Sequence, residues 1–265
     1  GYQLLQAVRE QGWELAGLLT THAHPDHCGG HAAVVTAAGC AVYASPLSRV
    51  VLEYPLWRSI MLHAGAAPPL GLREEFLLAQ PVSVTGIVAE EVPLPAELAD
   101  WSLTVFDLPG HDYGLTAFAV EGVLYCGDAF LAPGLLVRHG LPVLVDVAQT
   151  LASLERLVQE LIPGQRWIVA AHGGVYTPTE ACRVIHQNRA YLEEKLQLLL
   201  SQLDRPLAAD DLAAAMARAA GRRLRRMGEA ALYRLSVNAF LTYLETQGEV
   251  EAVPAGDLWH WQRRR

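Results

Sequence analysis

Six consecutive residues near the start of the chain, His22-Ala23-His24-Pro25-Asp26-His27, include four side chains of metal-binding type. Neutral imidazoles are good ligands for zinc and iron, and a carboxylate adds a hard, negatively charged ligand. Alternate residues of an extended segment point to opposite faces, so His22 and His24 converge only if the backbone bends sharply. Pro25 and the glycines after Cys28 favour such a bend. With 10 histidines among 265 residues, chance rarely produces this pattern, and we predict a metal site.

Rigid elements are predicted on both sides of this run. An amphipathic helix over residues 2–14 and an apolar strand over residues 15–20 precede it, and a helix over residues 30–38 follows. Ligands between a strand and a helix are held in position before a metal ion arrives.

A strand is predicted at residues 40–44. Residues 45–80 show no clean strand, so we predict an irregular insertion that forms either a lid over a site or a packed surface segment.

The rest of the chain alternates short strands with helices. Glu121-Gly122 is a hairpin turn by composition, and Asp146 and Thr177-Pro178 are residue types that begin helices. The expected strands are residues 87–92, 101–108, 115–120, 123–126 and 166–171, and a small hairpin within 248–261. The expected helices run from Asp146 to residue 162, from Thr177 to about residue 203, and over residues 208–220 and 230–247.

Composition favours one large domain, or one domain with a small appendage. Hydrophobic residues make up 52% of the chain and charged residues 18%, which allows a sizeable core and excludes a disordered chain. The net charge of −8 provides no global basic field for nucleic acid. The four cysteines are scattered and expected to be reduced, and no apolar stretch is long enough to span a membrane. We expect a cytoplasmic protein without a membrane partner.

Three downstream residues look like partners of the first cluster. His111 follows Leu108-Pro109-Gly110, Asp128 follows Tyr125-Cys126-Gly127, and His172 precedes Gly173-Gly174. Each is a metal-binding type at the exit of an apolar segment, beside a glycine that allows close backbone approach. Because all three occupy the same kind of position, they support one another as candidate ligands.

On these motifs the chain resembles the metallo-β-lactamase-fold hydrolase superfamily, in which HxHxDH, a later GH, a GD and a final strand-end histidine build a two-metal site. The resemblance covers about residues 1–180 and extends to glyoxalase II-like members and to LACTB-like members, whose tail is helical and of winged-helix type. It implies that the first metal is held by His22, His24 and His111, the second by Asp26, His27 and His172, and that Asp128 bridges them.

The resemblance also implies a fold class, an α/β protein with an αββα sandwich. Residues 1–204 would form the catalytic domain, with 45–80 as the lid insertion, and residues 205–265 a helical, winged-helix-like appendage. The family's first strands normally precede the opening helix, so the N-terminal strands are expected to be missing from this sequence. Asp112-Tyr113-Gly114 stands where many relatives have Thr-Pro-Gly, and Asp112 either orients a ligand histidine or caps a turn.

Such a site would perform hydrolysis. Two zinc ions, with iron or manganese as alternatives, would acidify a bridging water and polarise a carbonyl or phosphoryl oxygen. Asp26 would act as the catalytic residue by accepting a hydrogen bond from the resulting hydroxide. The substrate would be a small ester, thioester, lactone or phosphodiester. Cys28 is expected to be a buried structural thiol, and only position suggests His139 and residues 45–80 as substrate contacts.

Two alternatives belong to other classes. The resemblance also includes mononuclear iron sulfur-dioxygenases, which use two histidines and an aspartate, here His22, His111 and Asp128, and the same ligand types suit iron. A nucleic-acid-binding or processing protein would use the C-terminal module. The basic residues that could contact phosphates there are Arg222, Arg223, Arg225 and Arg226. The sequence indicates no oligomeric state.

Overall fold

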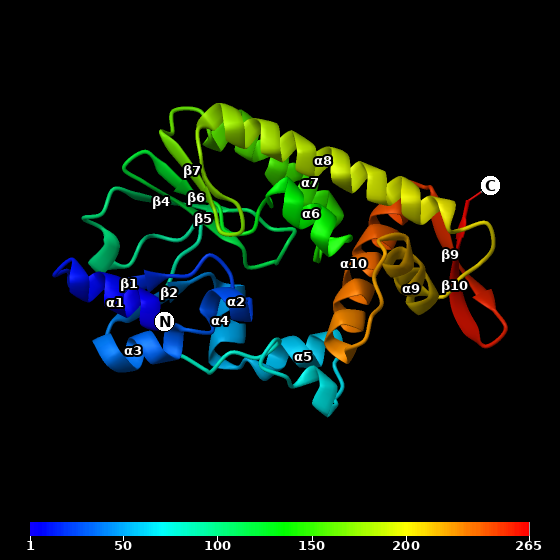
Figure 1. Cartoon of the computed structure of the whole chain (residues 1–265), viewed down its shortest axis with the longest axis horizontal. Coiled ribbons are helices and arrows are strands. Elements are labelled where there is room, and N and C mark those ends of the chain that lie inside the picture. Colours follow the sequence, from blue (N-terminus) through cyan, green and yellow to red (C-terminus); the bar gives the residue numbers. More distant parts are fainter. Residues whose placement is uncertain (265) are drawn as a thin grey trace. The chain divides into compact units, whose positions relative to one another are not determined.

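The computed structural model describes residues 1–264, and the chain divides into two compact units (Figure 1). The first unit comprises residues 1–108, 114–121 and 125–127, and the second comprises 109–113, 122–124 and the chain from 128 onward. The predicted catalytic domain and appendage, divided at residue 205, do not coincide with this division and stay a prediction.

A three-stranded parallel sheet is the centre of the first unit. Its order is β1-β2-β3, with β1 at Gly17–Leu19, β2 at Ala41–Ala44 and β3 at Gly86–Ile87. The accompanying helices are α1 (Tyr2–Glu10), α2 (Pro25–Cys28), α3 (His31–Ala38), α4 (Pro46–Glu53) and α5 (Leu56–Leu62), with 3₁₀ turns at Leu70–Leu72 and Ala96–Leu98.

Strand β2 is buried on both faces, which explains its uninterrupted apolar sequence. Successive strand residues point to opposite sides. Val42 and Ala44 pack in a cluster with Ala23 and Cys28, next to the histidines of the first motif. Tyr43, between them, packs in another cluster that includes Phe118. The motif therefore follows a sheet that is fixed by packing on its two faces.

A second sheet has the strand order β4-β5-β6-β7-β8. Its strands are β4 (Leu103–Asp107), β5 (Thr116–Val120), β6 (Val123–Tyr125), β7 (Trp167–Ala170) and β8 (Gly174–Tyr176). The predicted turn between β5 and β6 is confirmed, because Glu121 and Gly122 have φ of 49° and 78°, the two positive values that a tight hairpin turn requires. β4 and β5 pair antiparallel, as do β7 and β8.

Helices dominate the second unit, and the predicted beginnings of α7 and α8 are confirmed, whereas α6 was not predicted and α10 begins three residues before the predicted residue 230. Asp146 caps α7 (Val147–Arg156) by accepting a hydrogen bond from the Gln149 amide. Thr177 and Glu180 form a reciprocal capping box at α8 (Pro178–Ser201). α6 (Pro133–His139) lies beside α8, and a π-helical turn, Leu157–Leu161, extends α7.

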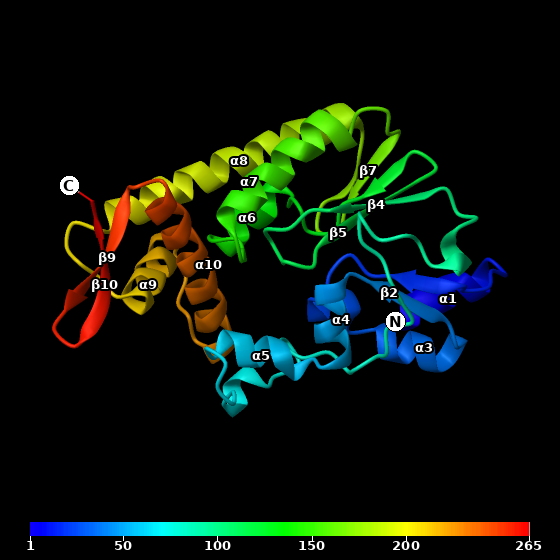
Figure 2. The same ribbon diagram turned by 180° about the vertical axis from the view of Figure 1, so that it is seen from behind.

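The C-terminal region of this unit consists of two helices followed by a hairpin (Figure 2). Helix α9 (Ala209–Ala219) packs on α10 (Met227–Thr246), and β9 (Val250–Ala255) pairs antiparallel with β10 (Leu258–Arg263). A bridge between Leu207 and Trp261 joins the segment before α9 to the hairpin. This helix–helix–hairpin order confirms the predicted helical C-terminal region.

Three predictions of local structure were wrong. Residues 45–80 are not irregular throughout, because Ser45 caps α4 and Pro46 occupies its first turn, and α5 follows. The strand expected at 87–92 shrinks to β3, and β8 was missed.

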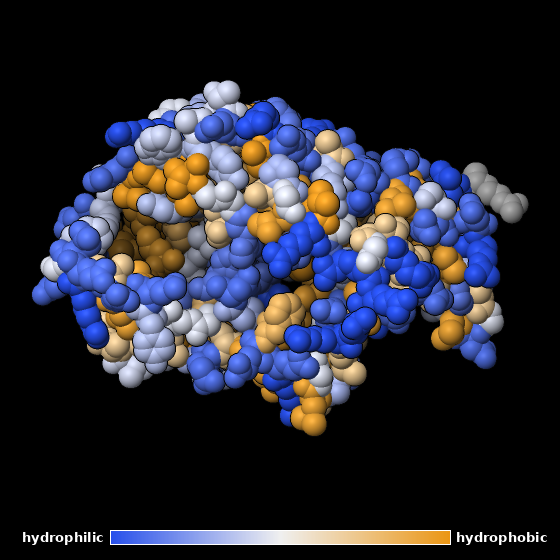
Figure 3. Space-filling model, in the orientation of Figure 1, coloured by the Kyte–Doolittle hydropathy of each residue, from blue (hydrophilic) through white to orange (hydrophobic). Residues whose placement is uncertain are grey.

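Figure 3 shows hydrophobic side chains exposed near α5, where Met61 is 62% and Leu70 82% exposed. The lid role of this segment remains a prediction. Among the described residues, no helix is long and apolar enough to cross a membrane.

The capping box of α8 yields a stability prediction. Thr177→Ala removes the side-chain acceptor for the Glu180 amide and the partner of the Glu180 carboxylate, and should cost about 1 kcal/mol. Thermal unfolding should show a lowered Tm for Thr177→Ala. Ser201→Ala, at the exposed end of the same helix, serves as the control and should leave Tm nearly unchanged. Equal Tm values for the two variants would contradict the capping role.

Candidate metal centre

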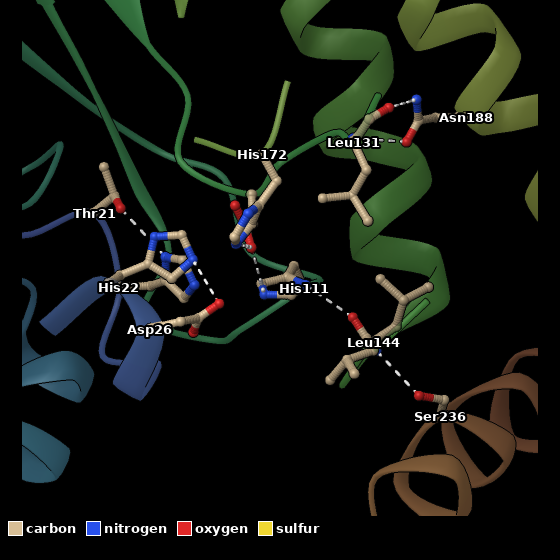
Figure 4. A network of polar contacts seen from close by, with 12 residues as sticks. Thr21, His22, Asp26, His111, Leu131, Leu144, His172, Asn188 and Ser236 are labelled. Atoms are coloured by element: carbon tan, nitrogen blue, oxygen red, sulfur yellow. Dashed lines mark hydrogen bonds and ion pairs between the residues drawn. The ribbon is translucent and has the colours of Figure 1, made fainter. Parts of the chain in front are cut away.

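The first cluster lies directly after β1. The Thr20 amide donates to the Tyr43 carbonyl at 2.9 Å, which continues the pairing with β2, and the Thr21 carbonyl accepts from the Thr116 amide at 2.8 Å. Backbone hydrogen bonds therefore fix the chain on the way into His22. The Thr21 hydroxyl lies 3.2 Å from Nδ1 of His22 (Figure 4).

A single helical turn, α2, supplies the bend that the sequence required. His24 is extended, Pro25 stands at the first helical position, and the amides of His27 and Cys28 donate to the His24 carbonyl at 2.9 and 3.0 Å. The turn ends at Gly29, where a Cβ would lie 2.5 Å from the Pro25 carbonyl oxygen. The motif expected to be a loop thus contains a short helix.

This turn gathers the side chains of the motif. The His22 ring centroid lies 4.5 Å from that of His24 and 4.2 Å from that of His27, and the Asp26 carboxylate lies 3.6 Å from Nε2 of His27. Burial differs strongly along the cluster: His22 is 0% exposed, whereas the side chain of Asp26 is 59% exposed.

The second cluster begins at His111, on a segment fastened to the start of α7. The Gly110 carbonyl accepts from the amides of Val145 and Asp146 at 2.9 and 3.1 Å. Gly110 has a φ of +137° and approaches α7 so closely that a Cβ would meet the Thr150 amide nitrogen at 2.5 Å. Only glycine combines this conformation with this contact.

The ring of His111 is oriented by the main chain. Its Nδ1 lies 2.8 Å from the Val143 carbonyl, an acceptor, so Nδ1 carries the proton. The other nitrogen, Nε2, lies 3.6 Å from Oδ2 of Asp128, and the same oxygen is 3.5 Å from Nε2 of His172. One buried carboxylate oxygen is thus shared by two imidazoles, which fits the donor set of a zinc or iron site.

Side chains of α8 and α10 hold the segments around this second cluster (Figure 4). Asn188 accepts a hydrogen bond from the Leu131 amide at 2.9 Å and donates to the Leu131 carbonyl at 2.8 Å. The Ser236 hydroxyl accepts from the Leu144 amide at 3.3 Å, next to the carbonyl that orients His111. These supports join residues far apart in the sequence, and the sequence alone did not identify them.

The remaining candidates are placed as follows. Cys28 is buried, and burial raises the pKa of its thiol to about 11, in agreement with a structural role. His139 is exposed at the end of α6. Arg222, on the α9–α10 loop, is partly buried, and the other three arginines of the basic run are exposed. The Asp112 carbonyl accepts from the Gly110 amide at 3.4 Å, and the role of the Asp112 side chain stays a prediction.

Comparison with known proteins decides the family. The model of the metallo-beta-lactamase superfamily matches residues 1–164, more than half of the chain. The chain belongs to this superfamily. The resemblance and the predicted α/β fold class are therefore confirmed, and the matched region contains both the first motif and two residues of the second cluster, His111 and Asp128.

Among curated proteins, the chain is similar to hydroxyacylglutathione hydrolases. It is 27% identical over 197 residues to that of Methylococcus capsulatus, covering 73% of this chain and 62% of the relative. It is 24% identical over 187 residues to that of Pseudomonas fluorescens, covering 70% and 58%. The chain spans about three fifths of the length of these relatives.

Solved structures of the same fold cover nearly the whole chain. A metallo-beta-lactamase family protein of Thermus thermophilus has a TM-score of 0.69 at 23% identity, covering 98% of this chain and 85% of that protein. A beta-lactamase domain protein of Burkholderia ambifaria has a TM-score of 0.69 at 20% identity, covering 98% and 79%. These likenesses concern the fold alone, which extends through the C-terminal helical region.

The close approach of Gly110 to α7 yields a second prediction. Gly110→Ala should displace His111 and lower both stability and bound metal, with strain of about 1–3 kcal/mol from the backbone conformation alone. Gly134→Ala is the matched control, because a Cβ there meets nothing within 4 Å. Metal analysis and thermal unfolding of both variants check this. Wild-type metal content in Gly110→Ala would show that His111 does not depend on the contact.

Proposed function

We propose that the two clusters together form a dinuclear metal centre, and that the protein is a metal-dependent thioester hydrolase. The observation that carries the proposal is the carboxylate of Asp128, whose one oxygen lies within 3.6 Å of the imidazoles of His111 and His172. A carboxylate oxygen between two imidazole nitrogens is the arrangement expected of a residue that bridges two cations. Membership in the superfamily supports the same interpretation.

The proposed ligands comprise all seven residues. His22, His24 and His111 would hold one ion, and Asp26, His27 and His172 the other. Asp128 would bridge them. Zinc suits this mixture of imidazole and carboxylate ligands, as does iron. The metals, when bound, would supply Lewis acidity and acidify a water molecule.

The protein's own groups prepare this centre in specific ways. The hydrogen bond from His111 Nδ1 to the Val143 carbonyl leaves Nε2 as the ligand atom, and it fixes the plane of the ring. Asp26 is the more exposed of the two carboxylates, so it can accept a hydrogen bond from the reacting hydroxide and orient it. Cys28 stays protonated at neutral pH and supplies no nucleophile.

Thioesters are the substrate class that the relatives favour. The curated relatives are named hydroxyacylglutathione hydrolases, and hydrolysis of an acylglutathione breaks a thioester bond. Because this chain spans about three fifths of their length, the substrate itself is not carried over. Esters, lactones and phosphodiesters remain comparison substrates, and the iron dioxygenase and nucleic-acid alternatives stay untested predictions.

Metal analysis combined with a substrate panel tests the proposal. We expect about two zinc equivalents per chain, hydrolysis of S-acyl thioesters, loss of turnover after chelation, and recovery when zinc is restored. Thioester hydrolysis that survives complete metal removal would overturn the proposal. A single tightly bound metal would overturn the dinuclear centre, and oxygen consumption with a glutathione persulfide by iron-loaded protein would favour the dioxygenase instead.

The role of Asp26 yields a further prediction. Asp26→Asn should lower kcat by about 10²- to 10⁴-fold, because a neutral amide replaces the carboxylate that accepts a hydrogen bond from the reacting hydroxide. Asp100→Asn, an exposed carboxylate outside both clusters, should leave kcat unchanged. Steady-state kinetics at matched metal content measures the difference. A wild-type kcat in Asp26→Asn would show that Asp26 takes no part in the reaction.

A further inference from the structure

Helix α6 connects the second metal-ligand cluster to the C-terminal helices, all within the second unit. At its start, the Ala132 amide donates to the His172 carbonyl at 3.4 Å. At its end, the Tyr233 hydroxyl of α10 donates to the His139 carbonyl at 2.7 Å, and the Tyr191 hydroxyl of α8 reaches the Gly140 carbonyl at 2.8 Å. Seven helical residues span only about 10 Å, so the C-terminal helices are fastened close to His172.

The end of α6 is closely packed against the end of α9. A Cβ on Gly140 would overlap the Cβ of Ala220, at the end of α9, and would lie 3.1 Å from the Tyr233 hydroxyl. Gly140 also has a φ of +75°, which disfavours any other residue. The loop that carries Arg222 is thereby held against the end of α6.

Arg222 is aimed at this helix end. Its Nη1 donates to the Arg138 carbonyl at 2.8 Å, which uses one of the five guanidinium N–H groups. Within residues 1–264, neither Arg222 nor Arg138 forms an ion pair with a carboxylate. A partly buried guanidinium with remaining donors and no acidic partner is an arrangement suited to an external anion.

The neighbouring charges act on the same place. Although much of His139 is exposed, partial burial of its imidazole lowers its pKa, and the positive charges of Arg222 and Arg138 lower it further. The imidazole is therefore a neutral hydrogen-bond donor at pH 7. His172 and Asp128 also act electrostatically on His139, which places this basic group in the field of the metal-ligand cluster.

We propose that the C-terminal helices supply an anion-binding subsite, in which Arg222, with Arg138 and His139, binds a carboxylate or phosphate group of the substrate. This inference rests on the proposed function, because it assigns the thioester an anionic group on the side of the second cluster. Arg222 would bind the anion through a charge-assisted hydrogen bond, and Arg138 would add charge. The basic run thereby gains a small-molecule role distinct from nucleic-acid binding.

Equilibrium binding tests the subsite without relying on turnover. Three thioethers that contain no thioester bond serve as probes: S-hexyl-3-mercaptopropionate, its amide, and the S-hexyl thioether of 2-mercaptoethyl phosphate. Calorimetry with the metal-loaded protein should show tighter binding of an anionic probe than of the amide. Arg222→Gln should weaken binding of the anionic probe about tenfold or more and leave the affinity for the amide unchanged. Arg223→Gln, on the same loop but exposed, is the matched control and should change neither affinity.

Tighter binding of the carboxylate or of the phosphate probe than of the amide supports the subsite. The tighter of the two anionic probes identifies the anion that the subsite prefers. Equal binding of all three probes to the wild type, or equal weakening of anion and amide in Arg222→Gln, overturns it. Should Arg222→Gln fail to fold, the wild type still decides, because added NaCl must weaken the anionic probe and not the amide. Anion binding without thioester hydrolysis would refute the proposed function and leave the subsite intact.

Discussion

Gly110 lies so close to α7 that a methyl group at its Cα would meet the backbone of Thr150, and this contact determines where His111 can be. The same constraint recurs at Gly29, which lies against the Pro25 carbonyl. Imidazoles and carboxylates are costly to bury together, so their positions must be imposed by a backbone that cannot relax away. In this protein close main-chain contacts at strand ends fix these positions, and hydrogen bonds to carbonyl groups support them.

The sequence predicted most of the elements because their signals are local. Apolar runs identified β2 and β7, and capping residues identified the beginnings of α7 and α8. The helical turn α2 was missed although Pro25 follows an extended residue, because a four-residue helix produces no periodicity. The same kind of signal, Ser45 before Pro46, begins α4. The lengths of the strands were overestimated, because pairing stops where the neighbouring strand ends.

The candidate ligands were also identified from local patterns: four stand together in the first motif, and His111, Asp128 and His172 each follow or precede a glycine at a strand end. Their supports could not be. The hydrogen bond from Arg222 to Arg138 joins residues 84 positions apart, and that from Leu144 to Ser236 joins residues 92 apart. Such contacts depend on how helices pack, and a single sequence carries no signal for them. Arg222 therefore looked like one of four equivalent arginines that could contact phosphates, and only its contacts distinguish it from Arg223.

The uneven burial of the two clusters has a kinetic consequence. His22 is inaccessible to solvent, whereas the side chains of Asp26 and His172 are 59% and 39% exposed. In a centre of the proposed composition, the ion on the exposed side would exchange with the medium quickly, and the ion on the buried histidines slowly. Dialysis would then pass through a half-loaded protein before the empty one. Two preparations with the same average metal content could differ in which position is filled, and their history of metal exposure would decide how much of each is competent.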